Sequence, residues 1–131
     1  MTTRTVGVAL VIDDSTCMRS ILARLLQGLG WETREAADGR QALALLESGC
    51  RPDMAFVDWN MPVMNGLDLV TAVRSDPELQ RLRLVMVSSE SELGQIAVAL
   101  DAGADEYIVK PFTGDALAEK IALVTGTGAR R

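Results

Sequence analysis

Short apolar runs recur along the chain, and four of them end in a polar or charged residue. They are rich in aliphatic residues and too short for ordinary helices, which is typical of strands buried on both faces of a parallel sheet. Together with one more polar segment, these runs occupy Val6–Ile12, Thr33–Ala36, Met54–Val57, Leu84–Val87 and Tyr107–Val109. The pattern predicts an α/β domain with a five-stranded parallel sheet.

Helical periodicity fills the stretches between these segments. The expected helices begin at capping residues and stop at glycine or before proline. They run from near Ser15 to Gly30, from Arg40 to Ser48, from Leu67 to Arg74, from Glu92 to Ala102 with Ser91 as the N-cap, and over Gly114–Val124. We therefore expect five βα units in a single domain, residues 1–124, followed by a mobile C-terminal tail, residues 125–131.

Acidic side chains follow two of the predicted strands. Asp13 and Asp14 come after the first, and Asp58 ends the third. The carboxyl ends of parallel strands meet at one edge of a sheet, so these three carboxylates should converge. Carboxylates without histidine or cysteine favour a hard cation, Mg²⁺ above Ca²⁺. The alternative is that Asp13 and Asp14 only stabilise the start of the following helix.

Two further groups end strands at the same edge. Lys110 is a compact point charge that can pair with a carboxylate in one state and a phosphoryl oxygen in another. The hydroxyl of Ser88 can donate a hydrogen bond to a phosphoryl oxygen. The simpler interpretation of Lys110 is a salt bridge that only neutralises the acids. The other lysine, Lys120, is expected to be solvated on the last helix.

Composition excludes several classes of function. The net charge of −5 and the lack of a basic run argue against nucleic acid as a direct partner. No apolar stretch approaches the roughly 20 residues that cross a bilayer. The chain has no histidine, which rules out a Ser-His-Asp hydrolase. Cys17 and Cys50 are expected to be reduced thiols of a cytoplasmic protein, with a disulfide or redox role as the alternative.

These residues, in this order, resemble the receiver domain of two-component response regulators. The resemblance covers Val6 to about Val124 and is carried by four motifs: Val11-Ile12-Asp13-Asp14, Asp58-Trp59-Asn60-Met61-Pro62, Val85-Met86-Val87-Ser88-Ser89 and Val109-Lys110-Pro111-Phe112. The second motif and Gly103-Ala104-Asp105-Glu106-Tyr107 are most similar to stand-alone chemotaxis regulators of the CheY type. The resemblance implies a flavodoxin-like (βα)5 fold with strand order 2-1-3-4-5, and a cis bond before Pro111.

The resemblance also implies a reaction. Asp58 would accept a phosphoryl group from a histidine kinase in a Mg²⁺-dependent step, and Lys110 and Ser88 would contact the phosphoryl oxygens. The ligands of the ion would be Asp13, Asp14, Asp58 and the backbone carbonyl of Asn60.

A switch is implied as well. Ser88 would move toward the new phosphoryl group and Tyr107 would turn inward, changing the surface of the fourth helix, fifth strand and fifth helix. In the family, the positions of Asn60 and Glu90 tune the lifetime of the phosphoaspartate, and this pair resembles the short-lived type. The family most often has threonine where this chain has Ser88.

The expected function is that of a monomeric, single-domain response regulator that catalyses only its own phosphorylation and dephosphorylation. Its partners would be a histidine kinase and a downstream target, such as a flagellar motor switch, with neither nucleic acid nor membrane involved. A phosphorelay intermediate, a phosphate sink and a receiver fragment of a larger regulator remain alternatives. A Mg²⁺-dependent aspartyl phosphatase is a further alternative, but such enzymes usually carry a second acid just after the nucleophile, and this chain has Asn60 two residues after Asp58. An inert scaffold is the last alternative, and it predicts no Mg²⁺ binding.

Overall fold

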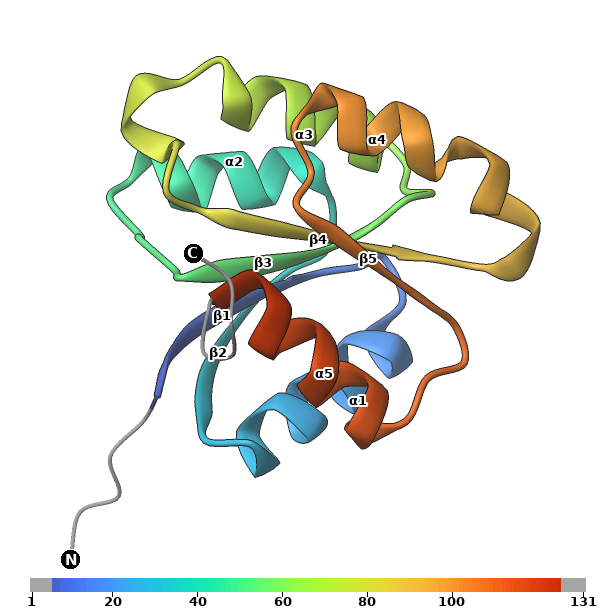
Figure 1. Cartoon of the computed structure of the whole chain (residues 1–131). Helices are drawn as coiled ribbons and strands as arrows, with labels where there is room; N and C mark the ends of the chain where they lie inside the picture. Colours follow the sequence, from blue (N-terminus) through green and yellow to red (C-terminus); the bar gives the residue numbers. More distant parts are fainter. Residues whose placement is uncertain (1–5, 126–131) are drawn as a thin grey trace, which may run out of the picture.

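The protein forms a single parallel sheet covered by helices on both faces (Figure 1). The structure is a computed structural model that describes residues 6–125. The strands are β1 (Gly7–Ile12), β2 (Trp31–Ala36), β3 (Met54–Asp58), β4 (Arg83–Ser88) and β5 (Glu106–Val109). They lie in the order β2-β1-β3-β4-β5, which confirms the flavodoxin-like order expected from the resemblance.

Helices alternate with the strands along the chain. They are α1 (Thr16–Gly28), α2 (Gly39–Glu47), α3 (Gly66–Arg74), α4 (Ile96–Ala102) and α5 (Gly114–Thr125), with short 3₁₀ helices η1 (Pro77–Leu79) and η2 (Glu90–Gln95). Helices α2, α3 and α4 cover one face of the sheet, and α1 and α5 cover the other (Figure 1). Within the described residues no helix is long and apolar enough to span a membrane.

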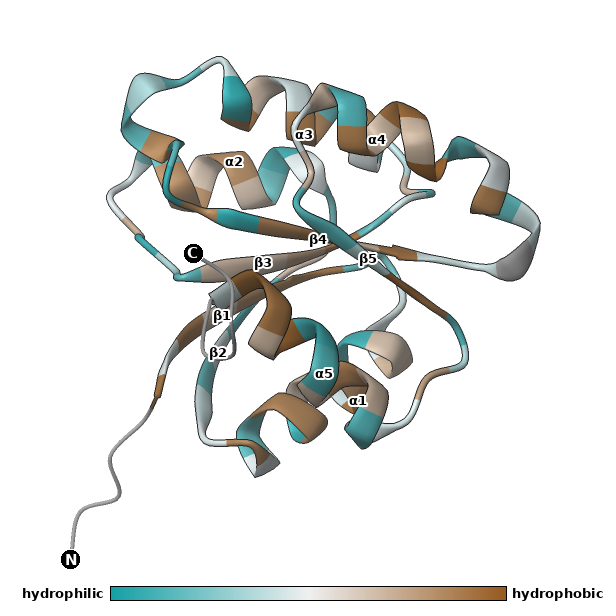
Figure 2. Cartoon of the chain, in the orientation of Figure 1, coloured by the Kyte–Doolittle hydropathy of each residue, from teal (hydrophilic) through white to brown (hydrophobic). Residues whose placement is uncertain are grey.

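Alternate residues of the central strands enter two separate cores. Leu10 and Ile12 of β1 face α2 and α3, whereas Ala9 and Val11 face α1 and α5. Because both faces are covered, β3 is buried at every residue. Figure 2 shows mostly hydrophobic residues along the central strands, whereas hydrophobic and hydrophilic residues alternate along the helices. This is why these strands are continuous apolar runs in the sequence.

Three helices begin immediately after the carboxyl edge of the sheet, each with a capping side chain. Ser15 accepts a hydrogen bond from the Met18 N–H, and Asp38 and Asn65 cap α2 and α3 in the same way. Such caps satisfy backbone N–H groups that have no partner within the helix. They fix the loops that carry the polar residues of this edge.

The predicted fourth helix is wrong at its beginning. The segment starts at Ser89 rather than Ser91, and it is a 3₁₀ helix, η2, before α4 begins at Ile96. The Glu92 carboxylate accepts a hydrogen bond from the Ser89 N–H at 2.9 Å. A serine followed three residues later by glutamate favours this earlier start.

Other boundaries differ by a few residues. Strand β2 begins at Trp31, before the expected Thr33, and α5 extends one residue further, to Thr125. Of the predicted tail, residues 126–131 lie outside the described part of the chain.

Candidate metal centre

Three carboxylates meet at the carboxyl edge of the sheet. Asp13 and Asp14 follow β1 and Asp58 ends β3, and their carboxylate oxygens lie within 4.8 Å of one another. The side chains of Asp13 and Asp58 are buried, whereas Asp14 is exposed. A cluster that is buried on one side and open on the other can hold an ion that keeps several waters.

Backbone hydrogen bonds fix the position of Asp13. Its N–H donates to the Ala36 carbonyl of β2 at 3.1 Å, which continues the pairing of β1 and β2 beyond the end of β1. Its carboxylate accepts a hydrogen bond from the Ser15 N–H at 2.8 Å. Arg19 donates to the Asp13 carbonyl oxygen at 2.7 Å, a contact that the sequence analysis missed. Asp13 is therefore held by the start of α1 as well as by the sheet.

The backbone of Asp58 packs closely against Gly66 at the start of α3. A Cβ atom added to Gly66 would lie 2.7 Å from the Asp58 carbonyl oxygen, and 2.9 Å from the side chain of Met86. No larger residue fits there without a shift of the backbone of β3 or α3. Glycine at the start of α3 therefore allows the loop after Asp58 to fold back tightly.

Lys110 reaches both buried acids. Its Nζ lies 3.3 Å from Oδ1 of Asp58 and 3.9 Å from Oδ2 of Asp13. Its backbone N–H donates to the Ser88 carbonyl at 2.8 Å. The Lys110–Pro111 bond is cis, which confirms the expectation from the resemblance.

Burial dominates the electrostatics of the two inner acids. It raises the pKa of Asp58 to about 6, the charge of Asp13 adds to that effect, and Lys110 opposes it. Burial also raises the pKa of Asp13, against the hydrogen bond from the Ser15 N–H. One ammonium therefore does not compensate three carboxylates. A divalent cation matches both the charge and the oxygen donors of this cluster.

Ser88 is the last residue of β4, the strand that pairs with β3, which ends at Asp58. In the sheet register Asp58 pairs with Val87, so Ser88 lies one residue further along the neighbouring strand. Its side chain is 1% exposed, and its Oγ has no hydrogen-bond partner among the described residues. A buried hydroxyl without a partner is costly. Such a hydroxyl is free to donate a hydrogen bond to a group that enters the site.

Tyr107 lies further from the acids, on the edge strand β5. Its half-buried side chain packs against the core beneath α2, α3 and α4. The expectation that Lys120 is solvated is wrong: its Nζ lies 4.4 Å from the centre of the Tyr107 ring and 3.1 Å from Oε1 of Glu106. The sequence did place an acid beside Tyr107, but nothing in it indicated that Lys120 of α5 would reach both residues.

The remaining predicted residues are less informative. Asn60 is exposed in the loop after β3. Glu90 opens η2, and its side chain lies outside the part of the chain that the structure describes.

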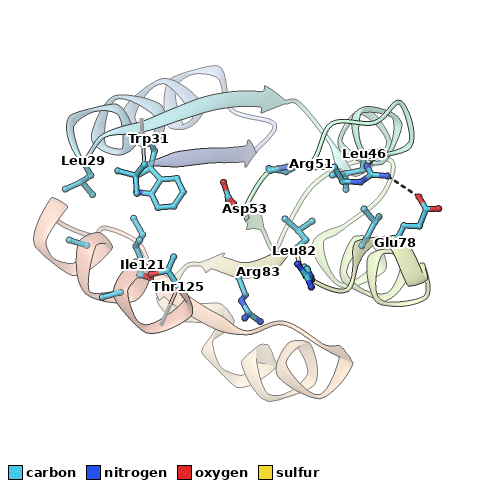
Figure 3. A pocket seen from close by; sticks show the side chains of 16 residues that line it. Leu29, Trp31, Leu46, Arg51, Asp53, Glu78, Leu82, Arg83, Ile121 and Thr125 are labelled. Atoms are coloured by element: carbon cyan, nitrogen blue, oxygen red, sulfur yellow. Dashed lines mark hydrogen bonds and ion pairs between the residues drawn. The ribbon is translucent and has the colours of Figure 1, made fainter. Parts of the chain in front are cut away.

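A large cavity, of about 950 Å³, lies at the opposite end of the sheet. Trp31, Asp53 and Arg83, which lie at or just before the amino ends of their strands, help to line it (Figure 3). None of the predicted site residues does. This cavity is therefore separate from the acid cluster at the carboxyl edge.

Comparison with known proteins adds independent information. A family model described as the response regulator receiver domain matches residues 9–122. The chemotaxis protein CheY1 of Helicobacter pylori is 44% identical over 90% of this chain and 96% of its own length. The chemotaxis protein CheY of Pseudomonas aeruginosa is 48% identical over 86% and 90%. A solved structure of CheY4 from Vibrio cholerae superposes with a TM-score of 0.83 at 34% identity, covering 90% of this chain and 98% of that one.

Proposed function

The chain belongs to the response regulator receiver domain family, and on that premise we propose that it is a chemotaxis response regulator phosphorylated on Asp58. The observation that carries this proposal is the acid cluster with Lys110 at 3.3 Å from the Asp58 carboxylate. The relatives named as chemotaxis proteins, each matched over at least 90% of its length, support the chemotaxis assignment.

The proposed metal ligands are the residues already gathered at the edge. Asp13, Asp14 and Asp58 would hold Mg²⁺, together with the backbone carbonyl of Asn60. When bound, the ion would neutralise negative charge on the phosphoryl group being transferred. The high pKa of Asp58 supports a need for a cation, because the ionised carboxylate is poorly compensated without one.

Asp58 is the proposed nucleophile. A carboxylate oxygen forms a bond to the phosphorus of a phosphohistidine, and the phosphorus–nitrogen bond of the donor breaks. The electron pair of that bond stays on the leaving imidazole. Lys110 pairs with Asp58 before transfer and with a phosphoryl oxygen afterwards, so the site keeps one fixed positive charge throughout.

Ser88 is the proposed sensor of the modification. Its partnerless hydroxyl would donate a hydrogen bond to a phosphoryl oxygen on Asp58. The accompanying movement of β4 and its loop would favour an inward position of Tyr107. A two-state element biased by a new charged group then changes the surface formed by α4, β5 and α5. Asn60 and Glu90, two residues after Asp58 and Ser88, would tune how long the phosphoryl group persists.

The proposed partners follow from this chemistry. A histidine kinase supplies the phosphoryl group, and a downstream protein, of which a flagellar motor switch is one candidate, binds the altered surface. We propose a cytoplasmic, monomeric protein that catalyses only its own phosphorylation and dephosphorylation. A phosphate sink, a phosphorelay intermediate or the receiver of a larger regulator would use the same site.

Intact-mass measurement after incubation with acetyl phosphate tests the proposal. We expect one added phosphoryl group in the presence of Mg²⁺, and none without Mg²⁺ or in Asp58→Asn. The matched control is Asp68→Asn, which changes an exposed aspartate on α3 and should label normally. Equal labelling of Asp58→Asn and the wild type would refute Asp58 as the acceptor. Sustained hydrolysis of p-nitrophenyl phosphate would instead favour the aspartyl phosphatase.

A further inference from the structure

We propose that Lys120, anchored by Glu106, holds the Tyr107 ring in its half-buried position and thereby sets the resting balance of the switch. This inference rests on the proposed function, because it assigns a regulatory role to a residue outside the reaction site. It concerns the unmodified protein, in which the lysine opposes the inward movement of the ring.

Glu106, Tyr107 and Lys120 contact one another, and we call this group of three residues the clamp. The Lys120 Nζ lies 4.4 Å from the centre of the Tyr107 ring, well inside the range of about 6 Å for a cation–π contact. The same nitrogen lies 3.1 Å from Oε1 of Glu106. That oxygen also accepts a hydrogen bond from the Tyr107 N–H at 3.0 Å. One carboxylate oxygen thus connects the backbone of the tyrosine to the cation that covers its ring.

Partial burial makes this group more than a surface ion pair. The side chains of Lys120 and Glu106 are only 25% and 22% exposed. An ammonium that is largely removed from water interacts more strongly with an aromatic ring and a carboxylate than a fully solvated one does. The lysine is therefore restricted to this position by two partners.

Lys120 approaches the Tyr107 ring from the face of the sheet opposite to Ser88, and its proposed role depends on this direction. Tyr107 pairs with Met86 in the register of β4 and β5, and Ser88 lies two residues after Met86. Residues two apart on a strand share a face, so Tyr107 and Ser88 belong to the face covered by α3 and α4. Lys120 comes from α5, which covers the opposite face, so it must reach the ring around β5, the edge strand.

An inward movement of the ring therefore carries it away from Lys120. Movement toward the space near Ser88 increases its distance from α5, while Glu106 continues to hold the ammonium at β5. The cation–π contact is lost in the inward state and is present in the described one. A contact made in only one of two states biases the equilibrium toward that state.

The chain offers a direct probe of this balance, because Tyr107 is its only tyrosine. Protein labelled with 3-fluorotyrosine reports the environment of this ring alone by ¹⁹F NMR. In the wild type, Mg²⁺ with beryllium fluoride, a mimic of the phosphoryl group, should move the resonance to the position of the inward state.

The variants test whether the charge of Lys120, and not the packing around it, determines the position of the Tyr107 ring. Lys120→Met keeps the aliphatic length and removes the charge, and it should move the unmodified resonance toward the inward position. Glu106→Gln should move it in the same direction by less, and Lys120→Arg should restore the wild-type position. The control is Glu119→Gln, an exposed neighbour on α5, which should have no effect.

The outcomes distinguish this inference from the proposed function. A wild-type resonance that does not respond to Mg²⁺ with beryllium fluoride overturns the switch and, with it, the clamp. A wild type that responds normally while unmodified Lys120→Met superposes on unmodified wild type overturns the clamp alone. A shift in Lys120→Met that Lys120→Arg also shows in full would assign the effect to packing and overturn the role of the charge.

Discussion

At the scale of single residues, the buried carboxyl of Asp58 links stability to pH. Its pKa of about 6 in the folded protein lies above the ordinary value of 3.8. The folded protein therefore holds this proton more tightly than the unfolded chain does. This contribution to stability is fully present below pH about 4 and is lost as the pH rises to about 6. At neutral pH without Mg²⁺, the ionised group opposes folding.

Replacing Asp58 by asparagine should remove this penalty. In urea unfolding without Mg²⁺ we expect Asp58→Asn to raise the free energy of unfolding at pH 7 by on the order of 2 kcal/mol. The difference should largely disappear at pH 4, where Asp58 of the folded wild type is protonated. Asp68→Asn, on an exposed carboxylate, serves as the control. A variant less stable than wild type at pH 7 would contradict the assignment of the raised pKa to burial.

Val63 carries backbone strain close to the site. Its φ is 69°, a left-handed value that is unusual for a β-branched residue, and its side chain is 76% exposed. The Met64 N–H donates to the Pro62 carbonyl at 2.7 Å, which closes a tight turn across Val63. The strained backbone of Val63 is therefore not offset by burial of its side chain.

Asparagine tolerates this conformation better than valine. We expect Val63→Asn to raise the free energy of unfolding by about 1 kcal/mol. Val98→Asn is the matched control, because Val98 is an exposed valine in the ordinary backbone of α4 and should gain nothing. Equal effects of the two substitutions in thermal or urea unfolding would show that the left-handed conformation is not the cause.

At the scale of elements, Arg74 joins α3 to the amino ends of the neighbouring strands. Its guanidinium donates to the carbonyls of Gly103 and Leu82 at 2.8 Å each, and to the Asp105 carboxylate at 2.9 Å. The side chains of Arg74 and Asp105 are each 17% exposed, so solvent only partly replaces these contacts. One residue therefore fixes the end of α3 against the loop that leads into β5.

Removal of this guanidinium should be costly. We expect Arg74→Met to lower the free energy of unfolding by about 3 kcal/mol, because Asp105 then stays partly buried without its cation. Arg24→Met changes an exposed arginine of α1 and should stay within about 0.5 kcal/mol of wild type. If the two variants were equally stable in denaturant unfolding, Arg74 would not join these elements as described.

The same scale shows where sequence patterns predict elements well. The central strands were predictable because burial on both faces leaves them uniformly apolar, as in Met54–Val57. Strand β2 began earlier than expected because it lies at the edge of the sheet, where Glu32 and Arg34 interrupt the apolar pattern. The start of η2 was misplaced because Ser89 and Ser91 are both capping residues, and only the position of Glu92 distinguishes them.

For the whole molecule, the convergence of the acids followed from one topological fact, that parallel strands present their carboxyl ends at a common edge. The contacts of Lys120 with Glu106 and Tyr107 do not follow from the topology, because they depend on the length of α5 and on how that helix packs against β5. The cavity near Trp31 was also missed, since it is lined by residues of several elements with no shared motif.

Mg²⁺ should stabilise the entire fold through the acid cluster. A ligand that binds only the folded state at about 100 times its dissociation constant adds about 2.7 kcal/mol to the free energy of unfolding. We expect the melting temperature to rise with Mg²⁺ concentration, and the rise to disappear in Asp13→Asn. Asp53→Asn, at the opposite end of the sheet, should retain it. An equal rise in Asp13→Asn would place the ion elsewhere.

The most direct test of the proposed function is to locate the modified residue. Borohydride reduces an aspartyl phosphate to homoserine, which peptide mass mapping identifies by position. After incubation with acetyl phosphate and Mg²⁺, the proposal predicts homoserine at position 58 and at no other aspartate, with none formed when Mg²⁺ is withheld. Homoserine at another aspartate, or unmodified Asp58 in protein that has gained a phosphoryl group, would contradict it.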